Sequence, residues 1–559
     1  METPRFKKDK IKTNVEKTTF TIPFNIQKFK ASYITETNIS NEQGENDILK
    51  KALESHAKGN TKEAAKFYQF LINKGINNSR VFSNLGVILK QANKIDEAIK
   101  LYQKSITLFP DSTEAYFNLG NIYKEQGKLS KAEELTRKAI ELNPNFTEAL
   151  INLGEILRDF NKVEEAETYI RQAIKIKPNE AKFHLKLGNI LYELGKLEEA
   201  ELATRRAIRI KPDFFEAYTN LGGILKKNGK SKEAESTILK AINLNPNFAD
   251  SYLNLGSIMR ANGKLKEAEL ATLKAIKINP FFAEAYSNLG GILREIGELK
   301  EAEKCLYKSL EINPNLVSPY FIISTFKNSE KNKSWKDSLF SEKILLEKNQ
   351  KEKIQIYFAR ANILHREKNY DKSSKYLNKA NDLNLKLRPS NFKAVLNKSK
   401  ALIIESNNLC FNRKEISNSS ENIFIVGMFR SGSTLIESII SMNKNVEDLG
   451  EVNILEESFI DWKNSKKNNI NKSLAQIYSE KVNCIKENPL ITTNKWLYNY
   501  QYSGIISKLL INSKIIHCFR NPLDNILSIY RAKFTSGSEY SSSILDSAKV
   551  YLDQEETME

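Results

Sequence analysis

The chain has 559 residues, 40% hydrophobic and 28% charged, with a formal net charge of +18. This length exceeds what one compact core supports, so it predicts several domains or an extended repeat array. Lysines are scattered along the chain, and no basic stripe with interleaved aromatic residues occurs, which disfavours a protein that binds nucleic acid.

The cysteines and the amino terminus indicate the cellular environment. Four cysteines lie far apart without a C-x-x-C pair, which argues against a disulfide framework and a metal site. The amino terminus lacks the apolar stretch of a secretory signal, and no window approaches about 18 consecutive apolar residues. We expect a flexible segment at 1–45 and a cytoplasmic protein with no membrane span.

The dipeptide Leu-Gly recurs at intervals of 34 residues in the first half of the chain. Its leucines are Leu85, Leu119, Leu153, Leu187, Leu221, Leu255 and Leu289. Alanines from Ala98 to Ala302 and prolines from Pro110 to Pro314 keep the same step. A period of this length indicates stacked units that each resemble the next.

One unit, residues 114–147, shows what each repeat is expected to form. Apolar residues recur at helical spacing up to Gly127, and a second apolar face around Ala132 predicts another helix. The small residues Gly120 and Ala132 allow close packing before Pro144 ends the pair. The unit resembles the tetratricopeptide repeat, which implies an α-solenoid, a superhelix with a protein or peptide in its concave groove.

The array is predicted to span 46–317, with seven regular repeats at 80–317. Looser versions of the same pattern continue through a degenerate helical region at 318–412. A polar linker at 413–422 precedes a different pattern at 423–559. The sequence therefore predicts a repeat array followed by a separate domain.

An asparagine precedes Leu-Gly in six of the seven units, and Lys186 is the exception. This asparagine row comprises Asn84, Asn118, Asn152, Asn220, Asn254 and Asn288. An amide can donate and accept at once, as binding of a peptide backbone requires. A similar row is seen in the array of O-linked N-acetylglucosamine transferase, which implies peptide binding. Simple duplication of the repeat explains the row equally well.

The last domain opens with a short apolar run that ends at Gly427, followed by a loop and an apolar helix. This order is typical of loops that bind phosphate groups. Gly427 and Gly432 have the spacing of a Walker A loop, but Ser433 replaces its lysine, which disfavours a kinase. Arg430, the hydroxyls of Ser433 and Thr434, and backbone N–H groups can still hold an anion. A purely structural strand-to-helix turn is the alternative.

A second motif follows about ninety residues later. Residues 514–519 are expected to form a strand, and Arg520 comes directly after it. A helix beginning near Pro522 would bring Ser528 back over the end of that strand. Arg520 and Ser528 could then hold a single phosphate group.

Together, the two motifs resemble the sulfotransferases that use 3′-phosphoadenosine 5′-phosphosulfate (PAPS). The tyrosylprotein sulfotransferase branch and its bacterial relatives fused to tetratricopeptide repeats are the most similar. The resemblance runs from about residue 422 to the chain end and implies a P-loop-like, doubly wound parallel sheet, with PAPS as donor and no metal. It assigns cofactor binding to Gly427, Arg430, Ser431, Gly432, Ser433, Thr434, Arg520 and Ser528.

The same resemblance implies the catalytic groups. Glu451 matches the family's catalytic base, and a carboxylate suits removal of a proton from an acceptor hydroxyl. Lys495 and Arg430 would offset the charge that develops on the bridging oxygen. Taken alone, Glu451 could equally be a solvated carboxylate, and Lys495 a surface lysine.

Other positions are interpreted as structural or depart from the family. His517 lies in an apolar strand and is predicted to be a core residue, as are Trp462 and Trp496. Phe429 replaces the usual proline, and Asn521 the commoner aspartate. The chain ends soon after the second motif, whereas related domains continue, so we expect the domain to be incomplete at its C-terminus.

The sequence thus predicts transfer of a sulfuryl group from PAPS to a hydroxyl, with protein tyrosine as the first acceptor and a glycan as the next. The repeat array would recruit the polypeptide substrate. The alternative is a protein-interaction scaffold whose C-terminal domain is inactive or binds nucleotide weakly.

Overall fold

The computed structural model describes residues 42–326, 334–346, 348–409, 421–467, 472–487, 489–534 and 537–559. Most of the predicted segment 1–45 and of the linker 413–422 therefore lies outside the described residues. The chain divides into two compact units, of which the first ends at Ile296 and the second begins at Gly297. Each unit is described by itself below.

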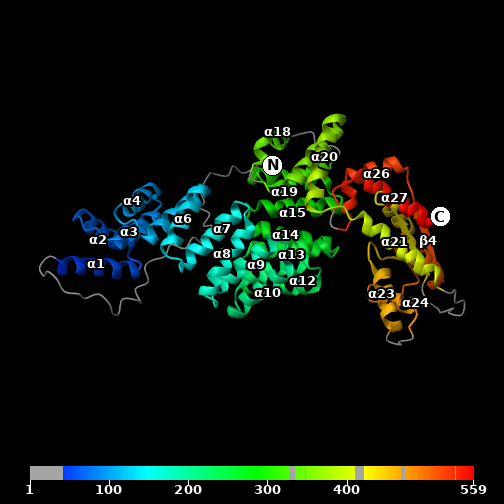
Figure 1. Ribbon diagram of the computed structural model, residues 1–559, viewed down its shortest axis with the longest axis horizontal. Coiled ribbons are helices and arrows are strands. Elements are labelled where there is room, and N and C mark those ends of the chain that lie inside the picture. Colours follow the sequence, from blue (N-terminus) through cyan, green and yellow to red (C-terminus); the bar gives the residue numbers. More distant parts are fainter. Residues whose placement is uncertain are drawn as a thin grey trace, which may run out of the picture. The chain divides into compact units, whose positions relative to one another are not determined.

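The first unit consists of helices that pair in chain order, each odd-numbered helix with the next one, except the last helix, which packs on the one before it (Figure 1). Its helices are α1 (Glu42–Ala57), α2 (Thr61–Asn73), α3 (Ser79–Gln91), α4 (Ile95–Leu108), α5 (Thr113–Glu125), α6 (Leu129–Leu142), α7 (Thr147–Asp159), α8 (Val163–Ile176), α9 (Ala181–Glu193), α10 (Leu197–Ile210), α11 (Phe215–Lys227), α12 (Ser231–Leu244), α13 (Ala249–Ala261), α14 (Leu265–Ile278) and α15 (Ala283–Ile296). Each pair packs on the next one, so the predicted helical solenoid is confirmed.

Small residues hold the two helices of a repeat close together, as the sequence predicts. A Cβ atom on Gly222 would lie 2.4 Å from the Ile238 side chain on the partner helix, so a larger residue cannot fit without a shift. The alanines that recur every 34 residues in the second helices, from Ala98 to Ala302, are fully buried. Gly127 adopts a φ of 73°, which ends its helix in the left-handed conformation that glycine tolerates.

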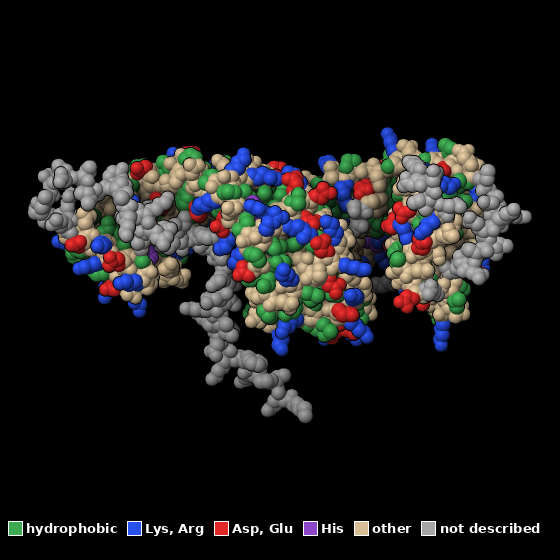
Figure 2. Space-filling model, turned by 90° about the horizontal axis from the view of Figure 1, so that it is seen from below, with side chains coloured by type: hydrophobic (Ala, Val, Ile, Leu, Met, Phe, Trp, Pro, Cys, Tyr) green, Lys and Arg blue, Asp and Glu red, His purple; other side chains and the backbone are tan. Residues whose placement is uncertain are grey.

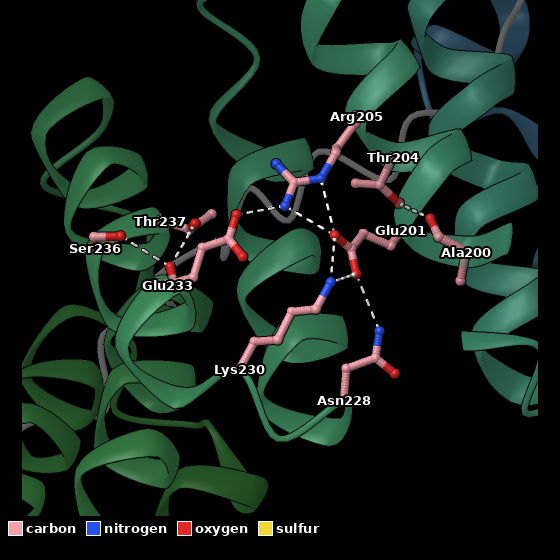
Figure 3. A network of polar contacts seen from close by, with 9 residues as sticks. All are labelled: Ala200, Glu201, Thr204, Arg205, Asn228, Lys230, Glu233, Ser236 and Thr237. Atoms are coloured by element: carbon pink, nitrogen blue, oxygen red, sulfur yellow. Dashed lines mark hydrogen bonds and ion pairs between the residues drawn. The ribbon is translucent and has the colours of Figure 1, made fainter. Parts of the chain in front are cut away.

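Ion pairs join successive repeats along the second helices (Figure 3). Glu201 on α10 accepts hydrogen bonds from Arg205, from Lys230 and from Asn228 at 2.9–3.1 Å. Arg205 also pairs with Glu233 of the next repeat. Equivalent networks surround Glu133 and Glu167. Single surface pairs contribute little to stability, but such networks fix the register of neighbouring repeats.

The second unit combines further helices with a parallel sheet (Figure 1). Its elements are α16 (Leu299–Ile312), α17 (Val317–Ser324), α18 (Ser334–Phe340), η2 (Glu342–Leu345), α19 (Gln350–Arg366), α20 (Tyr370–Leu387), α21 (Phe392–Asn407), β1 (Glu421–Gly427), α22 (Ser433–Ile440), β2 (Val446–Asp448), α23 (Ile454–Lys467), α24 (Leu474–Asn483), β3 (Ile491–Asn494), η3 (Leu497–Tyr502), α25 (Ser503–Leu509), β4 (Ser513–Cys518), α26 (Pro522–Tyr530), η4 (Glu539–Ser542) and α27 (Ile544–Met558).

The described strands run parallel in the order β2-β3-β1-β4. After β1 the chain crosses to β2 and β3 on one side, and it then returns to β4 on the other side. The sheet is therefore doubly wound, and its topological switch point lies between β1 and β4. Ligands of such sheets bind at the carboxyl ends of the strands beside this point. The predicted α/β fold is thus confirmed.

Helix α21 belongs to the packing of the α/β domain, although its sequence continues the degenerate helical region. Leu402 of α21 joins the apolar core around Phe424 of β1. Ser399 donates a hydrogen bond of 2.6 Å to the buried Asp553 of α27, which also accepts from Tyr500 at 2.9 Å. This helix therefore fixes the ends of the domain to each other. The domain boundaries predicted from the sequence stay predictions.

Candidate functional site

The loop between β1 and α22 has the backbone of an anion-binding turn. Gly427 has a φ of 150°, and a Cβ atom there would lie 2.4 Å from the Cys518 carbonyl oxygen of β4. Gly432, the N-cap of α22, has a φ of 99°. Arg430 also has a positive φ, 69°, which is unusual for a residue with a side chain. Such turns orient successive N–H groups toward one concave side.

The hydroxyl groups of this loop fit a ligand with several acceptor oxygens. The Ser431 side-chain oxygen is buried and has no hydrogen-bond partner among the described residues. Ser433 at the start of α22 is buried as well. An unpaired buried hydroxyl costs free energy unless a ligand or water satisfies it. The loop residues are therefore compatible with a bound phosphosulfate group.

Arg430 connects the loop to the second motif across the switch point. Its Nε donates to the Ser528 Oγ of α26 at 3.3 Å, and Arg520 Nη1 donates to the Arg430 carbonyl at 3.5 Å. Pro522 begins α26 as predicted, and Asn521 caps it by accepting from two backbone N–H groups. The structure thus brings together Arg430, Arg520 and Ser528 beside the ends of β1 and β4.

Lys495 lies directly after β3, on the other side of β1. Its Nζ is 3.0 Å from Glu437 Oε2 and 3.4 Å from Glu451 Oε1, and it donates to Thr434 Oγ1 at 3.2 Å. The Lys495 side chain is 7% exposed and that of Glu451 is 59% exposed. Lys495 is therefore not a surface lysine. Lys495 connects Thr434, at the start of α22, to Glu451, the predicted base.

The protonation of this cluster follows from its burial and its charges. Burial lowers the pKa of Lys495, but Glu437 and Glu451 outweigh that effect and raise it above the usual value. Burial raises the pKa of Glu437; Lys495 lowers it and Asp448 raises it, and the net direction is upward. Lys495 therefore stays positively charged at neutral pH, as an electrostatic role requires.

Glu437 is a site residue that the sequence analysis did not identify. It lies in α22 among apolar residues, and its carboxylate contributes nothing to apolar packing. Its isolation among leucine and isoleucine residues was the available signal, since buried charges require partners.

Phe429, which replaces the family's proline, packs against Tyr498 and Phe534 at ring distances of 5.8 and 5.1 Å.

His517 differs from the prediction because β4 is an edge strand among the described strands. Its side chain is 23% exposed, and its Nε2 lies 2.6 Å from Gln554 Nε2 and 3.7 Å from Glu555 Oε1 of α27. The histidine is therefore a polar contact of α27 and not a core residue. Trp462 is buried in the core, as predicted, and Trp496 is partly buried beside Tyr498.

The asparagine row bonds partly within the array. Asn152 donates to Asn121 and Asn220 donates to Asn189, each at 2.7 Å. Asn84 donates to Tyr68, Asn254 to the Thr219 carbonyl and Asn288 to Thr272, and Asn152 also accepts from Lys124. The buried Asn118 Oδ1 lacks a partner among the described residues. Peptide binding by the row stays a prediction.

Cavities follow the first helices of the central repeats. One, of about 240 Å³, is lined by Asn152, Phe183 and residues around them. Lys186, the exception in the asparagine row, lies in its wall and pairs with Glu155 at 2.5 Å. Lys124 pairs with the same carboxylate. A second cavity of about 260 Å³ is lined by Asn220, Asn254 and their neighbours.

Neither a metal-binding cluster nor a membrane-crossing helix occurs among the described residues. They contain no group of three or more histidine, cysteine, aspartate or glutamate side chains that could hold a metal ion. In the same part of the chain, no helix combines the length and the apolar character needed to cross a bilayer.

Residues 422–559 match the sulfotransferase family. Tetratricopeptide-repeat families match 86–127, 113–146, 147–180, 188–229, 215–248, 237–269, 283–316 and 354–386. An uncharacterized protein of Aquifex aeolicus (strain VF5) is 29% identical over 198 residues, which are 31% of this chain and 25% of that protein. The chain therefore spans a quarter of the length of this relative.

Several solved repeat proteins are similar to the array. YrrB, described as a tetratricopeptide-repeat protein with an unusual peptide-binding site, is 23% identical with a TM-score of 0.28, over 33% of this chain and 95% of its own. A tetratricopeptide repeat protein from Parabacteroides merdae is 20% identical with a TM-score of 0.38, over 45% of this chain and 99% of its own. The family matches show that the chain is a fusion of tetratricopeptide repeats with a C-terminal domain of the sulfotransferase family.

Proposed function

We propose that the C-terminal domain transfers a sulfuryl group from PAPS to a hydroxyl acceptor. The observation that carries this proposal is the contact of Arg430 with Ser528 and Arg520 at the topological switch point. It places two cations and a hydroxyl group where doubly wound sheets bind their ligands. The nucleotide would enter between the β1 loop and α26.

The loop residues would hold the 5′-phosphosulfate, and α26 the 3′-phosphate. Backbone N–H groups at the start of α22, with the hydroxyls of Ser431 and Ser433, would supply donors to the phosphosulfate oxygens. Arg520 and Ser528 supply a charged and a neutral donor to the second phosphate. Gly427 is required here because β4 leaves no room for a side chain.

The bound nucleotide supplies an activated sulfuryl group that passes to the acceptor oxygen. Glu451, the most exposed carboxylate in contact with Lys495, is accessible to an acceptor hydroxyl and would take its proton. Lys495 and Arg430 would stabilise the negative charge on the leaving phosphate oxygen. No residue of the proposed mechanism needs a metal ion as partner.

The acceptor is proposed to be a polypeptide, with tyrosine as the modified residue. Tetratricopeptide repeats commonly mediate protein interactions. The two cavities along the central repeats are large enough for side chains, and Asn152, Asn220 and Asn254 in their walls can bind backbone groups. The array would hold the substrate chain while the domain modifies it.

The alternative is a scaffold with an inactive sulfotransferase-like domain. One observation favours it: Lys495 lies 3.4 Å from Glu451 Oε1, so one oxygen of the proposed base is already engaged in an ion pair. In the scaffold reading the pair is permanent and only stabilises the loop. Sulfate transfer from labelled PAPS that is lost in Glu451→Ala would exclude the scaffold.

Calorimetric titration of the full chain with 3′-phosphoadenosine 5′-phosphate tests the nucleotide site. We expect Arg520→Ala to weaken binding by at least about tenfold, since it removes a charged hydrogen bond to phosphate. Lys444→Ala, at an exposed position of the same domain, is the matched control. Adenosine 5′-phosphate, which lacks the 3′-phosphate, should not distinguish Arg520→Ala from the wild type. Equal affinity of both proteins for the bisphosphate would contradict the assignment.

A further inference from the structure

A row of cations follows the asparagine row along the first helices of the repeats. It stands five residues after each Leu-Gly leucine, and we call it the cation row. Its members are Lys90, Lys124, Arg158, Lys226, Arg260 and Arg294, with Tyr192 at the remaining position. Repetition at one helical position places these side chains at equivalent points of successive repeats.

The following repeat supplies a carboxylate to three of these cations, whereas Arg158 pairs with Asp159 of its own helix. Lys90 pairs with Glu125 at 2.8 Å, and Arg260 pairs with Glu295 through two hydrogen bonds of 3.0 and 2.6 Å. Both carboxylates stand 35 residues after their cation. Lys124 instead pairs with Glu155, 31 residues after it. Two positions of the next repeat can therefore neutralise a member of the row.

Lys226 lacks both of these partners. The position 35 residues on is Ala261, and the position 31 residues on is Ser257. Lys226 is partly buried on α11, and no carboxylate of the described residues forms an ion pair with it. Burial and the nearby charge of Arg260 lower the pKa of Lys226, as expected for a cation that the array leaves unneutralised.

The cavity of about 260 Å³ lies on the same helix. Helix α11 contributes Asn220 and Gly223 to its wall, and Lys226 stands one helical turn beyond Gly223. A Cβ atom on Gly223 would meet only the Asn254 amide nitrogen, at 3.9 Å. The absence of a side chain at Gly223 therefore opens the groove beside two members of the asparagine row.

We propose that the groove over α9, α11 and α13 binds an extended polypeptide segment whose acidic side chain pairs with Lys226. This inference rests on the proposed recruiting role of the array and adds the chemistry of the partner. Asn220 and Asn254 would bind the backbone, and the cavity at Gly223 would accommodate the chain close to α11. One carboxylate from the partner completes the pairing that Ala261 and Ser257 leave open.

The other charges of the groove favour a polypeptide over a nucleic acid. Glu193 of α9 lines the cavity, and Glu155 of α7 and Glu295 of α15 lie on the first helices of the neighbouring repeats. A nucleic acid, with a charge on every residue, would place phosphates against these carboxylates, and like charges at an interface are costly. A polypeptide can present a carboxylate at Lys226 and neutral residues elsewhere.

Fluorescence anisotropy on the full chain tests the proposal with two labelled peptide pools. Each peptide has about ten residues, long enough to extend over about 33 Å, with mixed residues at every second position. The fixed positions are glutamate in one pool and glutamine in the other. We expect the wild type to bind the glutamate pool about tenfold more tightly, which corresponds to one partly buried ion pair.

Two variants from opposite sides of the pair should abolish this preference. Lys226→Gln removes the cation, and Ala261→Glu supplies the missing internal carboxylate, which would compete with the partner's. Ala261→Gln is the matched control and should keep the preference, as should Lys138→Gln on the outer helix α6. Thermal unfolding checks that each variant is folded.

The possible outcomes distinguish the acidic partner from recruitment by the array and from the nucleotide site. Equal binding of both pools by the wild type, or a preference that survives in Lys226→Gln, overturns the acidic partner and leaves recruitment intact. Absence of binding for both pools overturns recruitment as well. Competition by a single-stranded oligonucleotide that disappears in Lys226→Gln would assign the groove to nucleic acid. Nucleotide titration of the C-terminal domain is independent of all three results.

Discussion

Lys495 and Glu437 form an ion pair of 3.0 Å in which both side chains are almost completely buried. Glu437 lies in α22, the helix that follows the loop after β1, and Lys495 is the residue that follows β3. The pair therefore couples the position of the loop helix to that of the proposed catalytic lysine. A buried pair of this kind is costly to break, because the remaining charge loses its partner.

Glu437→Ala should destabilise the domain by about 3 kcal/mol, since it leaves Lys495 buried with only the exposed Glu451 as counter-charge. Urea denaturation followed by circular dichroism measures this change. Glu447→Ala, which removes an exposed pair with Lys486, is the control and should cost less than about 1 kcal/mol. Similar losses in both variants would mean that the buried pair contributes no more to the free energy of unfolding than the exposed pair does.

Gly427→Ala should prevent correct pairing of β1 with β4. The added methyl group would lie 2.4 Å from a backbone oxygen, and the φ of 150° disfavours any side chain. At Gly432 a methyl group meets nothing within 4 Å, so Gly432→Ala carries only the strain of its φ, about 1–2 kcal/mol. Chemical denaturation of both variants should show the larger loss for Gly427→Ala. The reverse order would exclude close packing against Cys518 as the reason for this glycine.

The repeat array was predictable because its period recurs many times in the sequence. Each Leu-Gly pair lies at an equivalent helix contact, so the local sequence pattern and the tertiary packing agree. The strand, loop and helix order around Gly427 was equally visible. Glu437, the packing of α21 and the edge position of His517 depend on contacts between distant segments. A single charged residue in an apolar helix indicates that a partner exists, but the sequence does not say that the partner is Lys495.

The cavity of about 240 Å³ carries a carboxylate, that of Glu155, whose ionisation should be visible in the acid stability of the first unit. Burial raises the pKa of Glu155, but the charges of Lys124 and Lys186 outweigh burial and lower it to about 2. A carboxyl with a lowered pKa in the folded state stabilises the fold above its unfolded value of about 4.3. That contribution, about 2–3 kcal/mol, is lost as the pH falls from about 4.3 to 2.

Glu155→Gln should therefore be less stable than the wild type at pH 7 and nearly equal to it near pH 2. Thermal unfolding between these pH values, followed by circular dichroism, measures the difference. Glu141→Gln is the control, because Glu141 pairs with Lys138 on an exposed surface. A constant difference between Glu155→Gln and the wild type at all pH values would show that the two lysines do not lower the pKa of Glu155.

The asparagine row offers a last test, because its members bond to partners that can be changed separately. Asn220→Ala and Asn189→Ala each remove the 2.7 Å hydrogen bond between these residues, but only Asn220→Ala removes a member of the row. If the row binds peptides, both variants lose about 1 kcal/mol of stability, and Asn220→Ala also weakens peptide binding, by about fivefold or more. If repeat duplication alone explains the row, the two variants bind peptides equally well. Anisotropy with the glutamate peptide pool and thermal unfolding of both proteins distinguish the two cases. The peptide role would also be excluded if a variant kept its binding after alanine had replaced Asn118, Asn152, Asn220 and Asn254 together.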